Sequence, residues 1–140
     1  AIKEILFRAA DRLQVETILV ANQSIAIAKS KLIRSVTVRD GANVADDRIV
    51  DLMQAGDLVI TGDIPLAARV VEKGGVALSP RGELLDDKTV HERLAVRDLM
   101  EQFRAAGVPT AGPKPLSQKD VQAFANQLDR LLTRLVRRRS

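Results

Sequence analysis

The sequence contains no cysteine, no tryptophan and no tyrosine, and its aromatic residues are three phenylalanines. Without cysteine, the residues shown hold no disulfide scaffold, no Cys-ligated zinc site and no thiol nucleophile. An aromatic content of 2% argues against a base-stacking platform of the single-strand-binding type. The core must therefore be built from Ala, Val, Ile and Leu.

Long apolar runs and the common catalytic motifs are also missing. No apolar run approaches the roughly 20 residues that span a bilayer, and Lys3 and Glu4 interrupt the start, where a signal peptide would be apolar. We find no phosphate-binding loop, dinucleotide fingerprint or Ser/His/Asp arrangement, and the single histidine, His91, is expected on a helix surface. We therefore expect a cytoplasmic protein without a membrane segment, whose 140 residues form one domain.

Charge is unevenly distributed along the chain, which carries a net charge of +4. Residues 26–39 hold four cations and no acid, and residues 129–140 hold five arginines against one acid. Residues 40–63 hold six aspartates against one arginine. An acidic centre between basic segments suits a metal site that meets a polyanion such as RNA. The alternative is that these charges only solvate the faces of a small domain.

Hydrophobic periodicity predicts helices alternating with strands. The expected helices are residues 2–13, 44–55, 64–73, 87–106 and 117–136, and the expected strands are 15–21, 32–39, 57–61 and 76–79. This order predicts an α/β fold with three layers around one mostly parallel sheet, PIN-like or Rossmann-like, in which residues 87–137 are helical. Doubly wound sheets normally begin with a central strand, whereas this chain opens inside a helix. We therefore expect a first strand that is missing from the residues shown.

Local signals set the expected helix ends and the buried face of the long helix. Asn43 and Asp63 are expected to cap the helices that follow them, and Gly56 to end the first of these. Ser117 and Asp120 form a capping-box pattern. Four apolar residues of helix 87–106 are expected to be buried: Val90, Leu94, Leu99 and Phe103.

Acidic and polar residues follow the predicted strands at the edge where ligands bind in open α/β sheets. Asp63 follows strand 57–61, and Asp46 and Asp47 open the helix after strand 32–39. Asn22 and Ser24 follow strand 15–21. Asp57 begins its strand, roughly 17–20 Å from Asp63, and is expected to be a turn residue.

Carboxylates gathered at one edge are the ligands that Mg²⁺ or Mn²⁺ prefers. A cation held there lowers the pKa of bound water and braces a phosphodiester. The alternative interpretation is structural: Asp63 is a well-placed helix cap, and Asp46 and Asp47 lie in a first turn, where the helix dipole favours anions.

Several segments resemble one bacterial family. The run from Gly56 to Ala67 (GDLVITGDIPLA), together with residues 44–50 (VADDRIV), is similar to the YaiI/YqxD family. Further similar segments are residues 19–24 (LVANQS), 80–83 (PRGE), 93–98 (RLAVRD), 112–113 (GP) and 117–120 (SQKD). The likeness spans essentially all 140 residues.

The resemblance implies a PIN-like nuclease fold with an acidic site for divalent metal. By this likeness Asp63 is the aspartate after the fourth strand, Thr61 precedes it in the motif, and Asp46 is the acid opening the preceding helix, with Asp47 a weaker match. Family members begin with a strand ending in Asp-x-Asp-x-Cys-Pro, which this chain does not show.

The leading hypothesis is therefore a Mg²⁺- or Mn²⁺-dependent endoribonuclease. Its catalytic residues are Asp63 and Asp46, and its metal ligands are these two and Asp47. Asn22, Ser24 and Thr61 would orient substrate or water, and a basic set would contact phosphates without reading sequence: Lys29, Lys31, Arg34 and the C-terminal arginines.

Two alternatives remain open at this point. One is a module that binds nucleic acid or regulates without catalysis. The other is an interaction protein whose two C-terminal helices, with exposed Leu131, Leu132 and Leu135, form a homo-oligomer surface.

Overall fold

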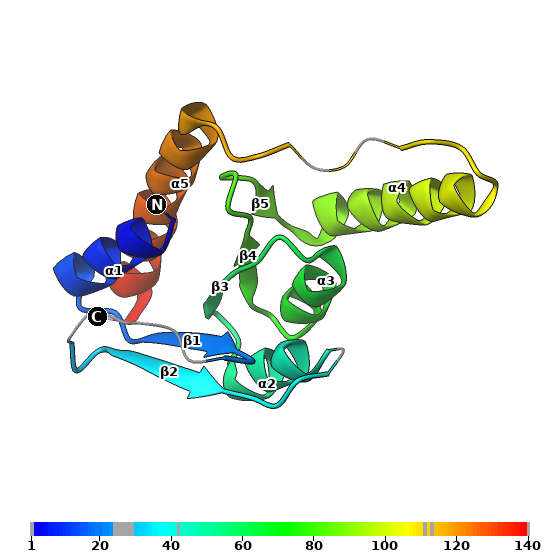
Figure 1. Ribbon diagram of the computed structural model, residues 1–140. Helices are drawn as coiled ribbons and strands as arrows, with labels where there is room; N and C mark the ends of the chain where they lie inside the picture. The colour runs from blue at the N-terminus through cyan, green and yellow to red at the C-terminus, as the bar shows by residue number, and fades with distance from the viewer. Residues whose placement is uncertain (1, 24–29, 42, 111, 113, 140) are drawn as a thin grey trace.

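The computed structural model describes residues 2–23, 30–41, 43–110, 112 and 114–139. Within these residues, helices and short strands alternate along the first two thirds of the chain, and two long helices follow (Figure 1). The elements are α1 (Ile2–Leu13), β1 (Thr17–Ala21), β2 (Ile33–Thr37), α2 (Val44–Leu52), β3 (Leu58–Ile60), α3 (Ile64–Glu72), β4 (Val76–Leu78), β5 (Leu84–Leu85), α4 (Asp87–Ala105) and α5 (Gln118–Arg139). The α/β class is confirmed. The two-residue strand β5 was not predicted, because so short a segment carries no periodicity.

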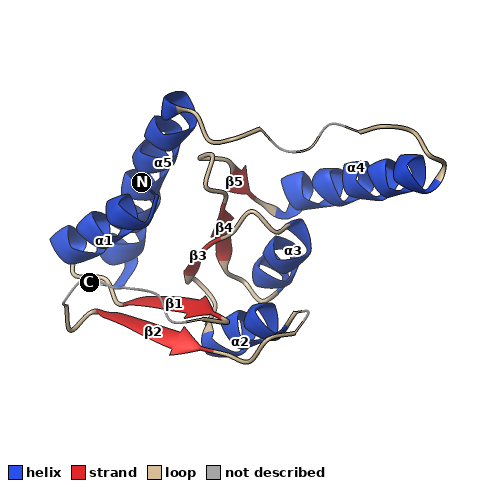
Figure 2. Cartoon of the chain, in the orientation of Figure 1, coloured by secondary structure: helices blue, strands red, loops and turns tan. Residues whose placement is uncertain are grey.

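The strands of the described residues form two sheets, where the sequence predicted one (Figure 2). β1 and β2 pair in parallel, from Thr17 opposite Ile33 to Ala21 opposite Thr37. In the second sheet β3 and β4 are parallel, and β5 runs antiparallel to β4. The expected parallel pairing is therefore present within each sheet, but no strand pairing among the described residues joins the two sheets.

Both faces of the second sheet are covered. Ala77 and Leu78 are adjacent in β4, and both are fully buried. Ala77 packs in a cluster with α3 and α4, whereas Leu78 packs in a cluster with α1 and α5. Because successive strand residues point to opposite faces, this alternation makes β3–β4–β5 the middle of three layers. Figure 1 shows α1 and α5 on one side of these strands and α2, α3 and α4 on the other.

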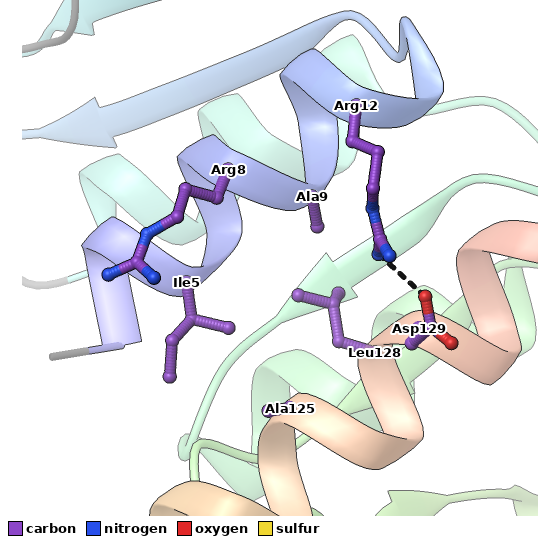
Figure 3. Close-up of a pocket in the computed structure, with 7 residues that line it drawn as sticks. All are labelled: Ile5, Arg8, Ala9, Arg12, Ala125, Leu128 and Asp129. Atoms are coloured by element: carbon purple, nitrogen blue, oxygen red, sulfur yellow. Dashed lines mark hydrogen bonds and ion pairs between the residues drawn. The ribbon is translucent and has the colours of Figure 1, made fainter.

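Helices α1 and α5 pack against each other through small and aliphatic side chains (Figure 3). Ala9 and Leu128 are buried there, and Arg12 Nη2 lies 2.6 Å from Asp129 Oδ1. Both partners of this ion pair are more than half exposed, so it contributes at most about 1 kcal/mol and apolar burial dominates.

The C-terminal leucines do not form the free surface considered above. Leu131 and Leu132 are 8% and 4% exposed, and they pack in the cluster beneath α1. The prediction that they are exposed is wrong, because the helix face that carries them is the one that covers the sheet. The oligomer hypothesis therefore loses two of the three leucines that it named, whereas Leu135 is half-buried.

The predicted cap before α5 is present, and the predicted cap before α2 is wrong. The Ser117 hydroxyl accepts a hydrogen bond from the Asp120 N–H, and Asp120 accepts one from the Ser117 N–H, which is the capping box expected before α5. Asn43 adopts a left-handed conformation (φ 66°) and makes no side-chain cap bond. The side chain therefore cannot reach the first turn of α2.

Helix α2 ends at Leu52, before the predicted boundary. Gly56 (φ +90°) lies in the following turn and does not terminate the helix. In that turn Asp57 Oδ2 accepts a hydrogen bond from the Gln54 N–H at 2.9 Å. The expectation that Asp57 is a turn residue is confirmed.

Helix α4 leaves the core partway along its length. Val90 is buried, but Leu99 and Phe103 are 47% and 39% exposed, so the prediction that they are buried is wrong. Continuing the face of Val90 by seven residues gives Arg97, a charged side chain, so the buried stripe stops. No helix in the described part of the chain has the length and apolarity needed to cross a membrane.

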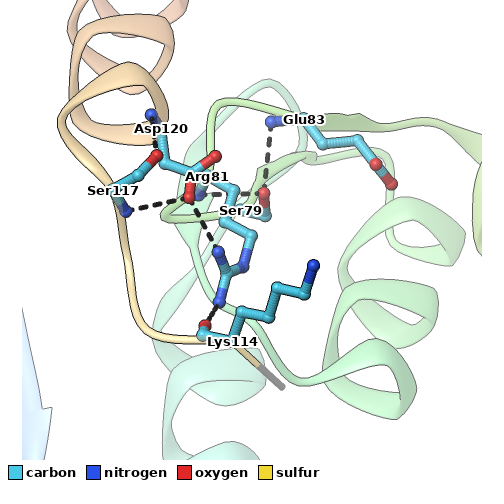
Figure 4. Close-up of polar contacts among 6 residues, drawn as sticks. All are labelled: Ser79, Arg81, Glu83, Lys114, Ser117 and Asp120. Atoms are coloured by element: carbon cyan, nitrogen blue, oxygen red, sulfur yellow. Dashed lines mark hydrogen bonds and ion pairs between the residues drawn. The ribbon is translucent and has the colours of Figure 1, made fainter. Parts of the chain in front are cut away.

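A polar network fastens the β4–β5 turn to the start of α5 (Figure 4). Arg81 Nη1 donates to Asp120 Oδ2 at 2.8 Å, and Arg81 Nη2 donates to the Lys114 carbonyl oxygen. The Ser79 hydroxyl accepts from the backbone N–H groups of Arg81 and Glu83. Arg81 thus links the β4–β5 turn to Asp120, a carboxylate that also caps α5. These bonds hold the turn against the start of α5.

Candidate functional site

Asp63 occupies the connection between β3 and α3, at the carboxyl end of the strand. Its Oδ1 accepts a hydrogen bond from the Leu66 N–H at 3.0 Å, and its own N–H donates to Thr61 Oγ1 at 3.0 Å. The predicted cap of α3 is confirmed. Because these bonds fix the backbone and one carboxylate oxygen, the side chain is held at the rim of the sheet while it remains exposed.

Asp46 lies in the first turn of α2 and shares this rim. Burial raises the pKa of its carboxyl above 3.8, and the negative charges of Asp63 and then Asp47 add to the rise, while Arg69 opposes it. The charge of Asp63 thus acts on the Asp46 carboxyl from a different crossover, with a smaller influence than burial. Such repulsion is what a cation placed between them would relieve.

Asp47 is held by a residue that the sequence analysis did not single out. Arg69 of α3 places Nη1 2.7 Å from Asp47 Oδ1, and its positive charge partly opposes the rise in the pKa of Asp46. A signal was available, because Arg69 lies on the helix that Asp63 caps and is the only cation in it. Which side of α3 faces α2, however, depends on packing that the sequence does not reveal.

The remaining predicted site residues are spread over both edges of the sheets. Thr61 is at the rim through its bond to Asp63, and exposed Asn22 directly follows β1. Lys31 lies just before β2 and Arg34 near its beginning, so the strand places them roughly 20 Å and roughly 10 Å from its carboxyl end. Arg34 Nε is 3.8 Å from Glu16 Oε1.

Two predicted contacts, Ser24 and Lys29, lie outside the residues that the structure describes.

The donor set suits a hydrated cation better than a protein cage. Among the described residues, no three His, Cys, Asp or Glu side chains gather closely enough to hold a metal ion. The pair Asp46 and Asp63 remains, and Mg²⁺ is commonly bound by one or two carboxylates while it keeps several waters. Two carboxylates with retained waters are the only such form left to the described residues, because they contain no closed site of three or more of these ligands.

Fold and rim together define a small α/β domain with paired carboxylates beyond the carboxyl ends of its parallel strands. The family model described as "Uncharacterized BCR, YaiI/YqxD family" matches residues 1–134, and the chain therefore belongs to this family.

Curated relatives in several bacteria agree with the family match. A "UPF0178 protein" of Shewanella piezotolerans is 59% identical over 132 residues, which are 94% of this chain and 87% of the relative. A "UPF0178 protein" of Halorhodospira halophila is 60% identical over 134 residues, 96% of this chain and 89% of the relative. One of Acidithiobacillus ferrooxidans is 59% identical over 133 residues, 95% of this chain and 90% of the relative. No solved structure matches the chain.

Proposed function

We propose that this chain is a PIN-like domain that cleaves RNA internally with the help of Mg²⁺ or Mn²⁺. The observation that supports the proposal is that Asp46 and Asp63 follow different parallel strands, and that the charge of Asp63 adds to the rise that burial causes in the pKa of Asp46. Like charges held together at a ligand-binding edge cost stability, and such a cost is typical of functional sites. The basic segments of the sequence supply the complementary attraction for a polyanion.

The residues of the chain have separate roles in this proposal. Asp63 and Asp46 hold the cation, which when bound supplies an activated water and charge stabilisation at the phosphate. Asp47 is secondary, because binding a metal would require it to leave Arg69. Arg69, once released, presents a fork of donors that matches a phosphate.

The remaining polar residues act on the substrate in this proposal. Asn22, Ser24 and Thr61 orient substrate or water at the rim. Lys29, Lys31 and Arg34 contact backbone phosphates away from the cleaved bond, without reading sequence.

Replacing Asp63 by Asn separates the metal role from the capping role. Asn caps a helix about as well as Asp, whereas Ala costs about 1 kcal/mol. We therefore expect Asp63→Asn to keep the stability of the protein and to lose RNA cleavage with Mg²⁺ or Mn²⁺. Asp46→Asn should also lose cleavage, and Asp51→Asn is the matched control, because Asp51 is an exposed carboxylate on α2 beyond the first turn.

The measurement is cleavage of bulk RNA by the three variants and the unchanged protein across both metals, with Mn²⁺ binding followed by paramagnetic line broadening. Loss of a ligand should weaken Mn²⁺ binding on the order of 100-fold. Equal cleavage by Asp63→Asn and the unchanged protein would refute the proposal, as would absence of cleavage with either metal.

One observation favours a second candidate, a domain that binds RNA without cleaving it. Asp47 is already neutralised by Arg69, and within the described residues no third carboxylate completes the pair. This candidate predicts RNA binding that weakens steeply with salt and is indifferent to metal and to Asp63→Asn.

A further inference from the structure

The large apolar side chains that remain exposed lie together on one segment of the chain. Within the described residues there are five of them, and all fall between positions 96 and 116: Val96, Leu99, Phe103, Val108 and Leu116. Single exposed apolar residues scattered over a surface are ordinary, whereas a contiguous cluster marks a place where another surface binds. The first three belong to the second half of α4, which is therefore the strongest candidate for an interaction surface.

The last turns of α4 extend beyond the rest of the domain. Residues 101–109 are all exposed, and Figure 1 shows this end of α4 pointing away from the sheets and from α3. In proteins most helical stability comes from the packing of an amphipathic face, because short helices alone are marginal in water. A partner surface on these turns would supply the packing that the domain does not give them.

The apolar residues at this end of α4 form a stripe along one face. Val96, Leu99, Met100 and Phe103, hereafter the α4 stripe, recur at intervals of three and four residues, as on a helix that packs against another helix. Val96 follows the buried Val90 by six residues, which turns it about 120° away from the face that packs on the core. The helix thus has two apolar faces, one covered by the domain and one exposed.

Charged residues of opposite sign stand at the two ends of the α4 stripe. Glu92, Val96, Met100 and Arg104 follow one another at intervals of four residues and form a row along the helix. Arg104 donates Nε to Thr110 Oγ1 at 3.1 Å, and in the part of the chain that is described no ion pair involves Glu92 or Arg104. The row therefore begins with an acid, ends with a base and is apolar between them.

Such a row is complementary to itself when a second copy runs antiparallel. Two antiparallel copies of α4 that cross at the middle of the row place Glu92 of each chain opposite the partner's Arg104. A parallel copy would instead place acid against acid and base against base. The antiparallel arrangement has the two-fold symmetry that is commonest among homodimers. Helix α4 carries four acids and four bases, so two copies approach without net repulsion, whereas a polyanion gains no net attraction there.

We infer that α4 is the interface of an antiparallel homodimer, in which the α4 stripe of one chain packs against the α4 stripe of a second copy. Between Val96 and Phe103 the helix rises by about 10 Å, so the contact is smaller than the roughly 800 Å² per partner of a standard interface. The dimer therefore exchanges with a folded monomer, with a dissociation constant above about 1 μM. The interface lies on α4 and the metal proposal concerns the rim, so neither depends on the other.

Charge reversal at the ends of the row tests the inference by analytical ultracentrifugation of the whole chain. The mass of the unchanged protein should rise from one chain to two between about 1 μM and about 500 μM. Glu92→Arg and Arg104→Glu each place like charges at both ends of the interface, so each alone should weaken the dimer on the order of 10-fold. An equimolar mixture of the two variants again places opposite charges at both ends and should restore the dimer.

Two further variants separate the interface from the charge and the stability of the chain. Asp98→Arg is the matched control for Glu92→Arg, because exposed Asp98 lies two residues after Val96, on the far side of α4 from the stripe. Phe103→Ser removes an apolar contact from both copies and should weaken the dimer on the order of 100-fold. At about 1 μM, where the chain is a monomer, its free energy of unfolding should equal that of the unchanged protein.

The outcomes distinguish the occupants of the α4 stripe. A dimer that both single reversals weaken, that their mixture restores and that Asp98→Arg leaves intact supports the inference. A mass of one chain up to about 500 μM overturns it and leaves the stripe to another protein or to the chain's own polypeptide. A dimer that neither reversal weakens also overturns it, because the two chains then meet elsewhere or in another orientation, and so does a mixture that fails to restore the dimer.

Discussion

Replacing Gly82 by alanine should destabilise the protein by about 2–5 kcal/mol, which is large for the addition of one methyl group. Gly82 lies in the turn between β4 and β5 with φ +85°, where a side chain costs about 1–2 kcal/mol. An added Cβ would lie 2.5 Å from the Ala123 carbonyl carbon and 2.7 Å from the Phe124 nitrogen. Both atoms are backbone of α5, so relief requires moving the turn or the helix.

That movement disturbs the core. Phe124 and Leu128 of α5 are fully buried, and a shift of the helix would loosen their packing at a further cost of about 1–3 kcal/mol. Gly56→Ala is the matched control, because Gly56 also has a positive φ (+90°) but no atom lies within 4 Å of the added Cβ. It should show the backbone cost alone.

Urea unfolding of the three proteins, with the free energy of unfolding extrapolated to water, measures the difference. We expect Gly82→Ala to unfold at clearly lower urea than Gly56→Ala. If the two variants lose the same free energy, the turn does not press on α5 as described, and the reasoning fails.

Three further predictions concern charge, core and surface. The pKa of Asp46 is raised in the folded state, so the free energy of unfolding falls as pH rises from about 3.8 through the folded-state pKa. Asp46→Asn should therefore be more stable than the unchanged protein at neutral pH and should lose this advantage in acid. Thermal unfolding of both proteins across pH measures the difference. Phe124→Ala should cost about 3–5 kcal/mol in urea unfolding, and a loss under 1 kcal/mol would mean that the side chain is not central to the core. Phe103→Ser should change the free energy of unfolding by less than about 1 kcal/mol, because Phe103 is exposed on α4, and a larger loss would show that something covers this face.

Much of the fold could be predicted from local signals. The periodicity of residues 2–13 gives the bounds of α1, and the capping residues Asp63 and Ser117 mark the starts of α3 and α5. Where a choice depended on tertiary contacts, the prediction failed. Leu99 and Leu131 are the same residue type on long helices, yet Leu99 is exposed and Leu131 is buried. Leu131 packs in the cluster with Leu78 of β4, whereas Leu99 belongs to neither core cluster.

The positions of the acidic residues of the candidate site could be predicted from the sequence. The rule that ligands bind at the carboxyl ends of strands placed Asp46 and Asp63 at one edge, and the repulsion between their charges agrees with that placement. The same rule, applied to β2, would have assigned Lys31 and Arg34 to the other edge, because they lie at the start of that strand. The contact between Arg69 and Asp47 could not be predicted, since it depends on how α3 is rotated against α2.

The pairing of the first helix with the last has a consequence for biosynthesis. Arg12 and Asp129 meet across 117 residues of sequence, and the apolar faces of α1 and α5 bury each other. A ribosome releases α1 long before α5, so the hydrophobic face of α1 stays without its partner until α5 has emerged. The layer formed by α1 and α5 should therefore form only after α5 has emerged, and truncated nascent chains that lack α5 should be the forms that chaperones retain.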